Sequence, residues 1–401
     1  MKKGWQTKNL GDLCDVVGGG TPPKDKPAFY WGDIPWATVR DMRQDVITET
    51  EFRITKDAVK SSATNIIPSG NVVIATRVGL GKVCLVAQDT AINQDLRGIV
   101  PHSDKTLVVR YLYWWLKSIA DVIVAEGTGA TVQGVKLPFV KSLQIPVPPL
   151  AEQQRIVGLL DDTFESLATA KANAEKNLQN ARALFESHLQ SVFTQRGPGW
   201  VEKPLGELCD IKHGFAFKGE FFTNKGDYVV LTPGNYYESG GYRDRGEKQK
   251  YYAGEIPPDY IMKEGEMLVA MTEQAAGLLG SPLLVPESDK FLHNQRLGLV
   301  TAKPGVPWTN EFFFHVFNTQ AVRQAIHDSA SGVKVRHTSP TKIGEVVVRF
   351  PTSIKEQKAI VAVLADLREE TQRLARLYER KLAALEALKK SLLHQAFTGE
   401  L

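Results

Sequence analysis

The chain has 401 residues, of which 43% are hydrophobic and 23% charged, a composition that excludes an extended disordered protein. Its length exceeds the usual size of one domain, so two hydrophobic cores are expected. The formal net charge of +4 suits an anionic partner, but many proteins that bind no nucleic acid share it.

No run reaches the roughly 20 apolar residues that cross a bilayer, and Met1 to Gln6 leads into no apolar signal segment. We therefore predict a cytoplasmic protein without membrane contact. The three cysteines, Cys14, Cys84 and Cys209, lack metal-ligand spacing, so free thiols and no metal site are expected.

The first half of the chain divides into a mixed region and a helix. In residues 1–149, short β-rich runs such as 72–75 alternate with turn clusters such as 18–23, and a helix is predicted over 106–120. Residues 150–196 contain no proline and only Gly158, and their apolar residues recur every three or four positions from Ile156 onward. This spacing predicts one long helix with a covered face.

The second half repeats this design, with a mixed region over 197–354 and a helix over 355–401. The second helix starts beside the second mixed region and has a matching apolar face, so we expect it to run antiparallel to the first. The alternative is that each helix packs only on its own domain. A helix of about 45 residues is about 65 to 70 Å long, which would hold two globular parts at a fixed separation, a length that corresponds to at most about 20 base pairs of duplex DNA.

Matching landmarks recur in the same order in both halves, which indicates an internal duplication. Between the landmarks the halves diverge, as two domains with different targets would. The matched pairs are 10–15 with 205–210, 69–75 with 264–270, Asn93-Gln94 with Asn294-Gln295, 127–130 with 329–332, and Glu152-Gln153 with Glu356-Gln357.

The run from Leu143 to Val157, which contains Pro146-Val147-Pro148-Pro149 and Glu152-Gln153-Gln154-Arg155, resembles the conserved-region signature of type I restriction-modification specificity subunits. The second copy keeps Phe350-Pro351, Glu356-Gln357 and Ile360-Val361 but lacks the Pro-Val-Pro-Pro run. The resemblance covers essentially the whole chain. It implies a mixed α/β fold, in which two target-recognition domains with small β-rich cores are joined by two long antiparallel coiled-coil helices with pseudo-twofold symmetry.

The same resemblance implies a subunit that binds a bipartite, asymmetric site in double-stranded DNA, one half with each recognition domain. It implies two modification (methyltransferase) subunits and two restriction (ATP-dependent translocase and nuclease) subunits as partners. S-adenosylmethionine, ATP and Mg²⁺ are then expected on those partners and not on this chain. An alternative is a free-standing coiled-coil DNA-binding or scaffold protein. The implied partner-binding residues are Pro148, Pro149, Glu152, Gln153, Pro351, Glu356 and Gln357.

Motifs for catalysis are missing from the sequence. An adenine methyltransferase needs an Asn/Asp-Pro-Pro-aromatic motif, and no such tetrapeptide occurs. Gly81-Lys82 departs from a nucleotide-binding loop, because Thr76 stands at the first glycine position and Val83 follows the lysine. These absences indicate that methyl transfer occurs on another chain, and together with the resemblance they predict a non-catalytic subunit of a restriction and methylation complex.

Sequence-specific DNA binding needs side chains that pair with base edges, while lysine and arginine on phosphates add affinity. Such residues fall in predicted loops after short strands. For Gln94 and Gln295 a structural hydrogen bond is favoured over adenine contact, and the stretch 243–250 is expected on phosphates. In the first domain the candidates are Thr38, Arg40, Asp41, Arg43, Arg77, Lys82, Thr131, Gln133 and Lys136. In the second they are Thr232, Asn235, Tyr236, Tyr237, Arg243, Arg245, Lys248, Lys250, Thr272, Glu273, Gln274, Lys334, Arg336 and His337.

Overall fold

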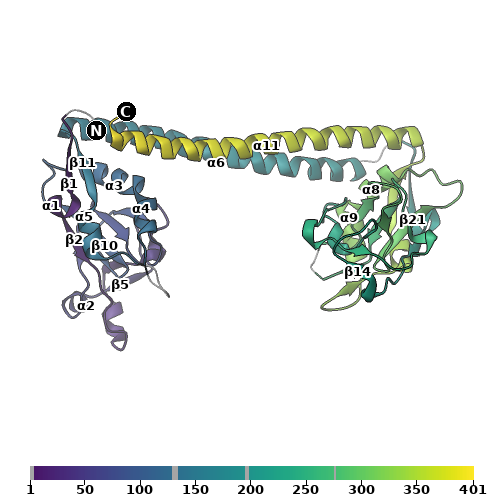
Figure 1. Ribbon diagram of the computed structural model, residues 1–401, viewed down its shortest axis with the longest axis horizontal. Coiled ribbons are helices and arrows are strands. Elements are labelled where there is room, and N and C mark those ends of the chain that lie inside the picture. The colour runs from purple at the N-terminus through teal and green to yellow at the C-terminus, as the bar shows by residue number, and fades with distance from the viewer. Residues whose placement is uncertain (1–3, 129–133, 195–197, 275–276) are drawn as a thin grey trace. The chain divides into compact units, whose positions relative to one another are not determined.

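The computed structural model describes residues 4–128, 134–194, 198–274 and 277–401. The chain forms two compact units: unit 1 is Met1–Glu175 with Glu379–Leu401, and unit 2 is Lys176–Tyr378. The two long helices predicted from the sequence are present as α6 (Leu150–Thr194) and α11 (Ile354–Thr398) (Figure 1). Each unit contains one mixed region and one portion of both helices. No helix in the described ranges has the length and apolar character that a bilayer crossing requires.

Unit 1 is built on two sheets, with strand orders β2-β10-β7-β8-β4 and β5-β3-β9-β6. The strands of the first are β2 (Cys14–Gly18), β10 (Leu96–Pro101), β7 (Val72–Ala75), β8 (Val83–Val86) and β4 (Val46–Ile47). Those of the second are β5 (Phe52–Ile54), β3 (Ile34–Ala37), β9 (Thr90–Ile92) and β6 (Ile66–Ile67). A separate antiparallel pair, β1 (Gln6–Asn9) with β11 (Gln144–Val147), leads into α6. The helices of the mixed region are α1 (Leu10–Leu13), α2 (Lys56–Lys60), α3 (Val109–Ser118), α4 (Ala120–Ala125) and α5 (Leu137–Ser142).

The burial of strand β7 shows that the first sheet of unit 1 is covered on both faces. Its four residues are all buried, and successive side chains of a strand point to opposite faces. Val72 and Ile74 join the core beneath α3 and α6, while Val73 and Ala75 join the core between the two sheets. A continuous apolar run therefore forms a central strand here.

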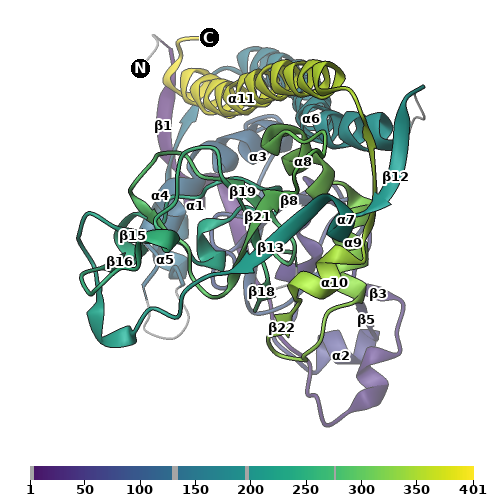
Figure 2. The same ribbon diagram turned by 90° about the vertical axis from the view of Figure 1, so that its right-hand side faces the viewer.

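Unit 2 repeats this arrangement, with sheets in the orders β13-β21-β17-β19 and β14-β16-β15-β20. The strands of the first are β13 (Cys209–His213), β21 (Leu297–Ala302), β17 (Met267–Ala270) and β19 (Pro282–Leu284). Those of the second are β14 (Phe222–Thr223), β16 (Tyr251–Tyr252), β15 (Val229–Val230) and β20 (Phe291–Leu292). Two-stranded pairs join β12 (Trp200–Pro204) to β23 (Val347–Pro351) and β18 (Thr272–Glu273) to β22 (Arg336–His337). The helices are α7 (Leu205–Leu208), α8 (Asn310–Phe317), α9 (Gln320–Asp328) and α10 (Pro340–Gly344), and α10 lies beside α7 and β13 (Figure 2).

Strand register confirms the duplication. In unit 1, Leu96 of β10 faces Ala75 of β7, and in unit 2, Leu297 of β21 faces Ala270 of β17. Both units also contain one parallel pair in the second sheet, β3 with β9 and β15 with β20. The two mixed regions are therefore copies of one fold.

The long helices pack on each other within unit 1 in antiparallel register. Arg155 donates to the backbone carbonyl of Leu401 at 3.0 Å, and Lys171 pairs with Glu386 at 2.6 Å. As residue numbers rise along α6 they fall along α11, which is the antiparallel course that the sequence predicts. In unit 2, Phe185 of α6 and Leu364 of α11 share one core with α8, so the helices are also part of the globular packing there.

The three cysteines are buried and form no disulfide. Burial raises the pKa of Cys14 and of Cys209 to about 12 and that of Cys84 to about 11. A thiol with so high a pKa is protonated at neutral pH and is a poor nucleophile. Cys14 and Cys209 occupy matching positions at the starts of β2 and β13, where they pack as small apolar residues.

Candidate nucleic-acid interface

Four loops of unit 1 meet at one end of its sheets. Thr76, after β7, donates its N–H to the carbonyl of Asp95 at 2.8 Å, and Val135 donates to the carbonyl of Thr76 at 2.9 Å. Asn93 donates to the carbonyl of Ala37, at the end of β3, at 3.0 Å. We call residues 38–41, 76–82, 93–95 and 134–136 the interface loops of unit 1.

The same four loops meet in unit 2. Met271 donates to the carbonyl of Arg296 at 3.0 Å, and Thr338 donates to that of Met271 at 2.9 Å. Leu231, between β15 and loop 232–237, donates to the carbonyl of Leu292 at the end of β20 at 3.1 Å, which places loops 232–237 and 294–296 beside each other. The interface loops of unit 2 are residues 232–237, 271–274, 294–296 and 331–338. Most of the candidates selected from the sequence fall in these two sets of loops, although they come from distant parts of the chain.

Thr38 and Asp41 form a capping box around the short turn Val39–Asp41. Asp41 Oδ2 accepts from the Thr38 N–H at 2.7 Å and from its hydroxyl at 3.0 Å. Thr232 and Asn235 form the same box in unit 2, with Asn235 Oδ1 accepting from the Thr232 N–H and hydroxyl, each at 3.0 Å. These polar atoms stabilise the loops, so the four residues shape the surface more than they offer groups to a base.

The cationic candidates of unit 1 lie at the surface. Arg40 is 3.5 Å from Glu51, and Arg77 is 3.7 Å from Asp95. Arg43 donates to the carbonyl of Arg40 at 3.0 Å. Lys82 and Lys136 are also exposed, so all five positive charges are accessible to a phosphate backbone. The remaining candidates in this unit, Thr131 and Gln133, lie outside the described residues.

Two candidates of unit 2 are interior residues. Tyr236 is 1% exposed, its hydroxyl has no hydrogen-bond partner among the described residues, and burial holds its pKa well above the usual value. Asn235 is fully buried and donates to Gln249 at 3.0 Å. The structure corrects the prediction for both, because neither side chain reaches an external ligand in this conformation. Tyr237 is 51% exposed and stays a candidate.

A basic hollow lies beside this turn. Arg243, Arg245 and Lys248 line a depression of about 540 Å³ together with Asp244 and Glu247. Arg243, Lys248 and Lys250 are exposed. This placement suits contact with phosphates, where charge matters more than side-chain geometry.

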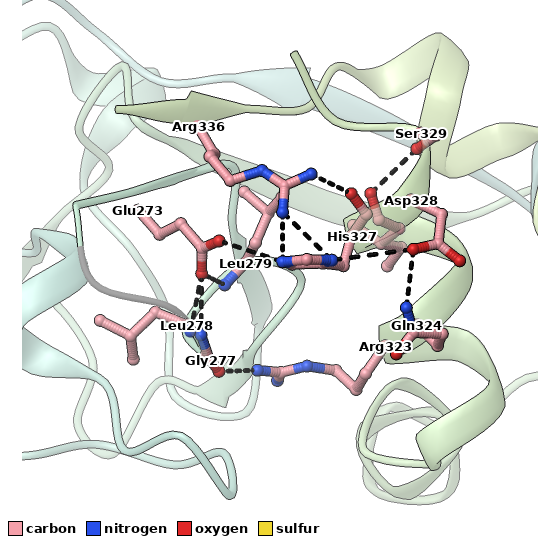
Figure 3. Close-up of polar contacts among 11 residues, drawn as sticks. Glu273, Gly277, Leu278, Leu279, Arg323, Gln324, His327, Asp328, Ser329 and Arg336 are labelled. Carbon is pink, nitrogen blue, oxygen red and sulfur yellow. Dashed lines mark hydrogen bonds and ion pairs between the residues drawn. The ribbon is translucent and has the colours of Figure 1, made fainter. Parts of the chain in front are cut away.

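The loop after β17 is organised by a buried carboxylate. Glu273 is 2% exposed, and its Oε2 accepts from the backbone N–H groups of Gly277, Leu278 and Leu279 at 3.0, 3.0 and 2.9 Å (Figure 3). Arg323 reaches the same loop through the carbonyl of Gly277. Burial lowers the pKa of Arg323 to about 10, so it remains charged at neutral pH. Glu273 is therefore a structural residue at the base of the loop, not a base contact.

Strand pairing brings the other candidates of unit 2 next to this loop. Thr272 pairs with His337 and Glu273 with Arg336, which joins loop 271–274 to loop 331–338. Arg336 donates to the carbonyl of His327 at 2.6 Å and contacts the His327 ring (Figure 3). Gln274, Lys334 and His337 are exposed and are the accessible members of the set.

The conserved-region glutamines are interior as well. Gln153 and Gln357 are fully buried, and each bonds three or more groups of its own unit. Pro148 and Pro351 are also buried, Glu152 pairs with Arg155 at 2.7 Å, and Glu356 accepts from the Trp200 indole at 2.8 Å. Of the predicted partner-binding set only Pro149 is exposed. The side chains of Pro148, Gln153, Pro351 and Gln357 are buried and do not reach a partner protein, so the prediction is corrected for these four residues.

A large open pocket in unit 1 was not found from the sequence. It measures about 890 Å³ and is lined by three of the interface loops together with the segment 21–36. Gln94 is exposed at its wall and accepts from the Thr21 hydroxyl, whereas the neighbouring Asn93 is the buried structural residue. Asn294 is likewise buried beside the exposed Gln295. In the described residues no group of three or more His, Cys, Asp or Glu side chains is placed to hold a metal ion.

Comparison with known proteins gives two matches to one family model. The model of the type I restriction modification DNA specificity domain matches residues 2–178 and 198–380. The specificity subunit of the Escherichia coli type I restriction enzyme EcoR124I/EcoR124II is 36% identical over 203 residues, which cover 48% of this chain and 49% of that protein. The MjaIX specificity subunit of Methanocaldococcus jannaschii is 27% identical over 236 residues, 53% of this chain and 54% of that protein.

The chain thus spans about half the length of these curated relatives in the matched regions. A solved structure described as the structural basis of complex assembly and conformational transition of the type I R-M system aligns with a TM-score of 0.77 at 18% identity. The alignment covers 100% of this chain and 99% of that one, which shows a shared fold.

Proposed function

Because this chain belongs to the type I restriction modification DNA specificity family, we propose that it selects the DNA site of a type I restriction-modification enzyme. Each unit contacts one half of a bipartite site in double-stranded DNA. The observation that carries this proposal is the duplicated set of interface loops, which places exposed polar and cationic side chains at the same end of the same fold in both units. Divergent side chains on a common frame are what recognition of two different half-sequences requires.

The chain itself is proposed to be non-catalytic. Methyl transfer and cleavage belong to two modification and two restriction subunits, which carry S-adenosylmethionine, ATP and Mg²⁺. The exposed apolar side chains Leu159 and Leu388 in unit 1, and Leu184, Val363 and Leu377 in unit 2, lie on the long helices and suit such partner contacts. The helices are better candidates for partner binding than the buried glutamines at their starts.

Helix length is proposed to set the gap between the half-sites. Both α6 and α11 are continuous over 45 residues and contribute to both units. Inserting four residues into each helix adds roughly 6 Å, or about two base pairs of DNA. An unchanged gap in the methylated sites of that variant would contradict this part of the proposal.

The main test uses the full chain in its native host. A tagged chain should co-purify with an S-adenosylmethionine-dependent methyltransferase, and mapping of methylated adenines should return one site with two short halves around a fixed gap. If no such partner joins the chain, or if methylation is unaffected when its gene is deleted, the proposal fails.

A further inference from the structure

The open pocket of unit 1 has apolar walls. Trp31 is 79% exposed, Val78 51% and Phe52 40%, which is an unusual gathering of large apolar side chains at a protein surface. Trp36 lies between Tyr30 and Phe52, with ring centroids 5.9 and 6.2 Å apart and edge-to-face geometry.

The polar atoms of Trp36 and Tyr30 are bonded to backbone carbonyls of the same unit. The Trp36 indole N–H donates to the carbonyl of Gly20 at 3.2 Å, and the Tyr30 hydroxyl donates to that of Pro22 at 2.8 Å. Because these two polar groups already have backbone partners, the Trp36 and Tyr30 rings offer mainly carbon atoms to a ligand.

The charged residues of the pocket are mostly cationic. Lys24, Arg40 and Lys82 line it, and Asp95 is the single carboxylate among its lining residues. Asp95 is already held by the Asn93 amide at 3.0 Å and faces Arg77 at 3.7 Å. A pocket with apolar walls and three cationic lining residues is complementary to DNA, whose phosphates surround the base edges of a groove.

In unit 2 the second sheet is packed against a cluster of aromatic side chains. Tyr252 of β16 and the neighbouring Phe217 are 4% and 8% exposed and pack on each other with ring centroids 4.8 Å apart. The aromatic side chains are thus exposed at the pocket of unit 1 and buried in this cluster of unit 2, a difference that suits two units with different half-sequences.

The apolar group that DNA presents in the major groove is the thymine C5-methyl. We propose that the pocket receives base edges of the half-site bound by unit 1 and that Trp31 makes apolar contact with a thymine methyl there. Gln94, at the wall of the same pocket, lies where its amide can pair with a neighbouring base. Lys24, Arg40 and Lys82 hold the flanking phosphates. This inference rests on the proposed function and adds to it a specificity-determining residue.

The experiment measures binding of the complete complex with its modification subunits to duplexes carrying the mapped site. Each thymine in turn is replaced by deoxyuridine, which removes only the methyl group. For the wild-type chain, one replacement in one half-site should weaken binding about three- to five-fold, the effect of burying one methyl. With Trp31→Ala the same replacement should have no effect, and Trp31→Phe should retain part of it.

Val122→Ala is the matched control, because Val122 is a 54% exposed apolar residue of the same unit that does not line the pocket. It should respond to deoxyuridine like the wild type. The proposal is overturned if no thymine shows a methyl effect that depends on Trp31, or if neither half-site contains a thymine on either strand. Specific binding by the wild-type complex without that dependence refutes this inference alone, whereas absence of specific binding refutes the proposed function.

Discussion

The side chain of Gln153 accepts a hydrogen bond from the backbone N–H of Val108 at 2.9 Å, which joins the first turn of α6 to the segment that precedes α3. Its amide also donates to the carbonyls of Thr106 and Pro148 at 3.0 and 2.9 Å. Gln357 repeats the arrangement in unit 2, accepting from the N–H of Thr309 at 3.1 Å and donating to the carbonyls of Pro307 and Pro351 at 2.8 and 3.0 Å. These glutamines fix the start of each long helix on the mixed region of its own unit.

We expect Gln153→Leu to destabilise unit 1 by on the order of 3 kcal/mol. The substitution leaves three backbone groups without partners, and each orphaned buried group costs roughly 1 to 3 kcal/mol. Urea unfolding of the full chain measures the change. The neighbouring Gln154 is exposed, so Gln154→Leu is the matched control and should change stability by less than about 0.5 kcal/mol. Equal unfolding free energies of the two variants would show that the hydrogen bonds of Gln153 do not stabilise unit 1.

The duplicated capping boxes predict which substitutions Asp41 tolerates. Asn235 performs in unit 2 the function of Asp41 in unit 1, so Asp41→Asn should keep the contacts with Thr38. It should lose only the hydrogen bond at 2.8 Å in which Asp41 Oδ1 accepts from the Glu51 N–H, because an amide nitrogen would replace that oxygen. Asp41→Ala removes both functions and should cost about 1 kcal/mol more than Asp41→Asn in thermal or urea unfolding. A larger loss for Asp41→Asn than for Asp41→Ala contradicts this interpretation.

Sequence patterns were sufficient to predict the two long helices and the internal duplication, because both repeat along the chain. Residues 150–194 and 354–398 lack proline and carry apolar residues at helical spacing, so the long helices could be predicted, and the ordered landmarks revealed the duplication. Burial within loops could not be predicted in the same way. Tyr236 follows a Pro-Gly-Asn turn that is typical of a surface, yet its ring fills the core between the sheets of unit 2.

The pocket around Trp31 was missed for a different reason. Its walls come from the segment 21–36, from Phe52 and from three separate loops, and only the fold brings these together. The one signal in the sequence was the Phe29-Tyr30-Trp31 run within a polar stretch, which could have been selected as an exposed aromatic cluster. For Gln153 and Gln357, recurrence in both halves indicated importance but did not distinguish a partner contact from an internal one.

Glu273→Gln should weaken recognition of one half-site and leave the other unchanged. Oε2 of Glu273 accepts three backbone N–H groups, and replacing the carboxylate by an amide loses the charge that strengthens these bonds. The loop that carries Gln274 should then lose its fixed shape. Binding to duplexes altered in one half at a time measures the effect, with exposed Glu264→Gln as the control. Equal loss at both half-sites would indicate a general folding defect instead.

The basic hollow of unit 2 predicts a change in salt dependence without a change in specificity. If Arg243 and Lys248 contact phosphates, the double variant Arg243→Ala, Lys248→Ala should weaken binding to specific and unspecific DNA by similar factors. The slope of log affinity against log salt should become shallower by roughly 0.9 for each lost contact. Binding titrations between low and moderate salt measure both quantities. A selective loss at one base position would instead assign these residues to base contacts.

Two buried histidines predict that unit 2 loses stability in mild acid. Burial lowers the pKa of His293 and of His315 to about 4, and the His293 ring bonds the carbonyl of Leu297 at 3.0 Å. The unfolded chain binds these protons near pH 6.5 and the folded unit only near pH 4. The stabilisation is therefore fully present above pH 6.5 and is lost as the pH falls from 6.5 to 4, by roughly 3 kcal/mol for each histidine.

His315→Gln tests this pH dependence, because it removes one titrating group from a site walled by Phe185 and Phe314. The variant will lose some stability at pH 7, so the informative quantity is the difference in unfolding free energy between pH 7 and pH 5. That difference should shrink by about 2 kcal/mol relative to the wild type. If the two proteins lose the same amount of stability over this interval, protonation of His315 does not contribute to acid unfolding and other groups must account for it.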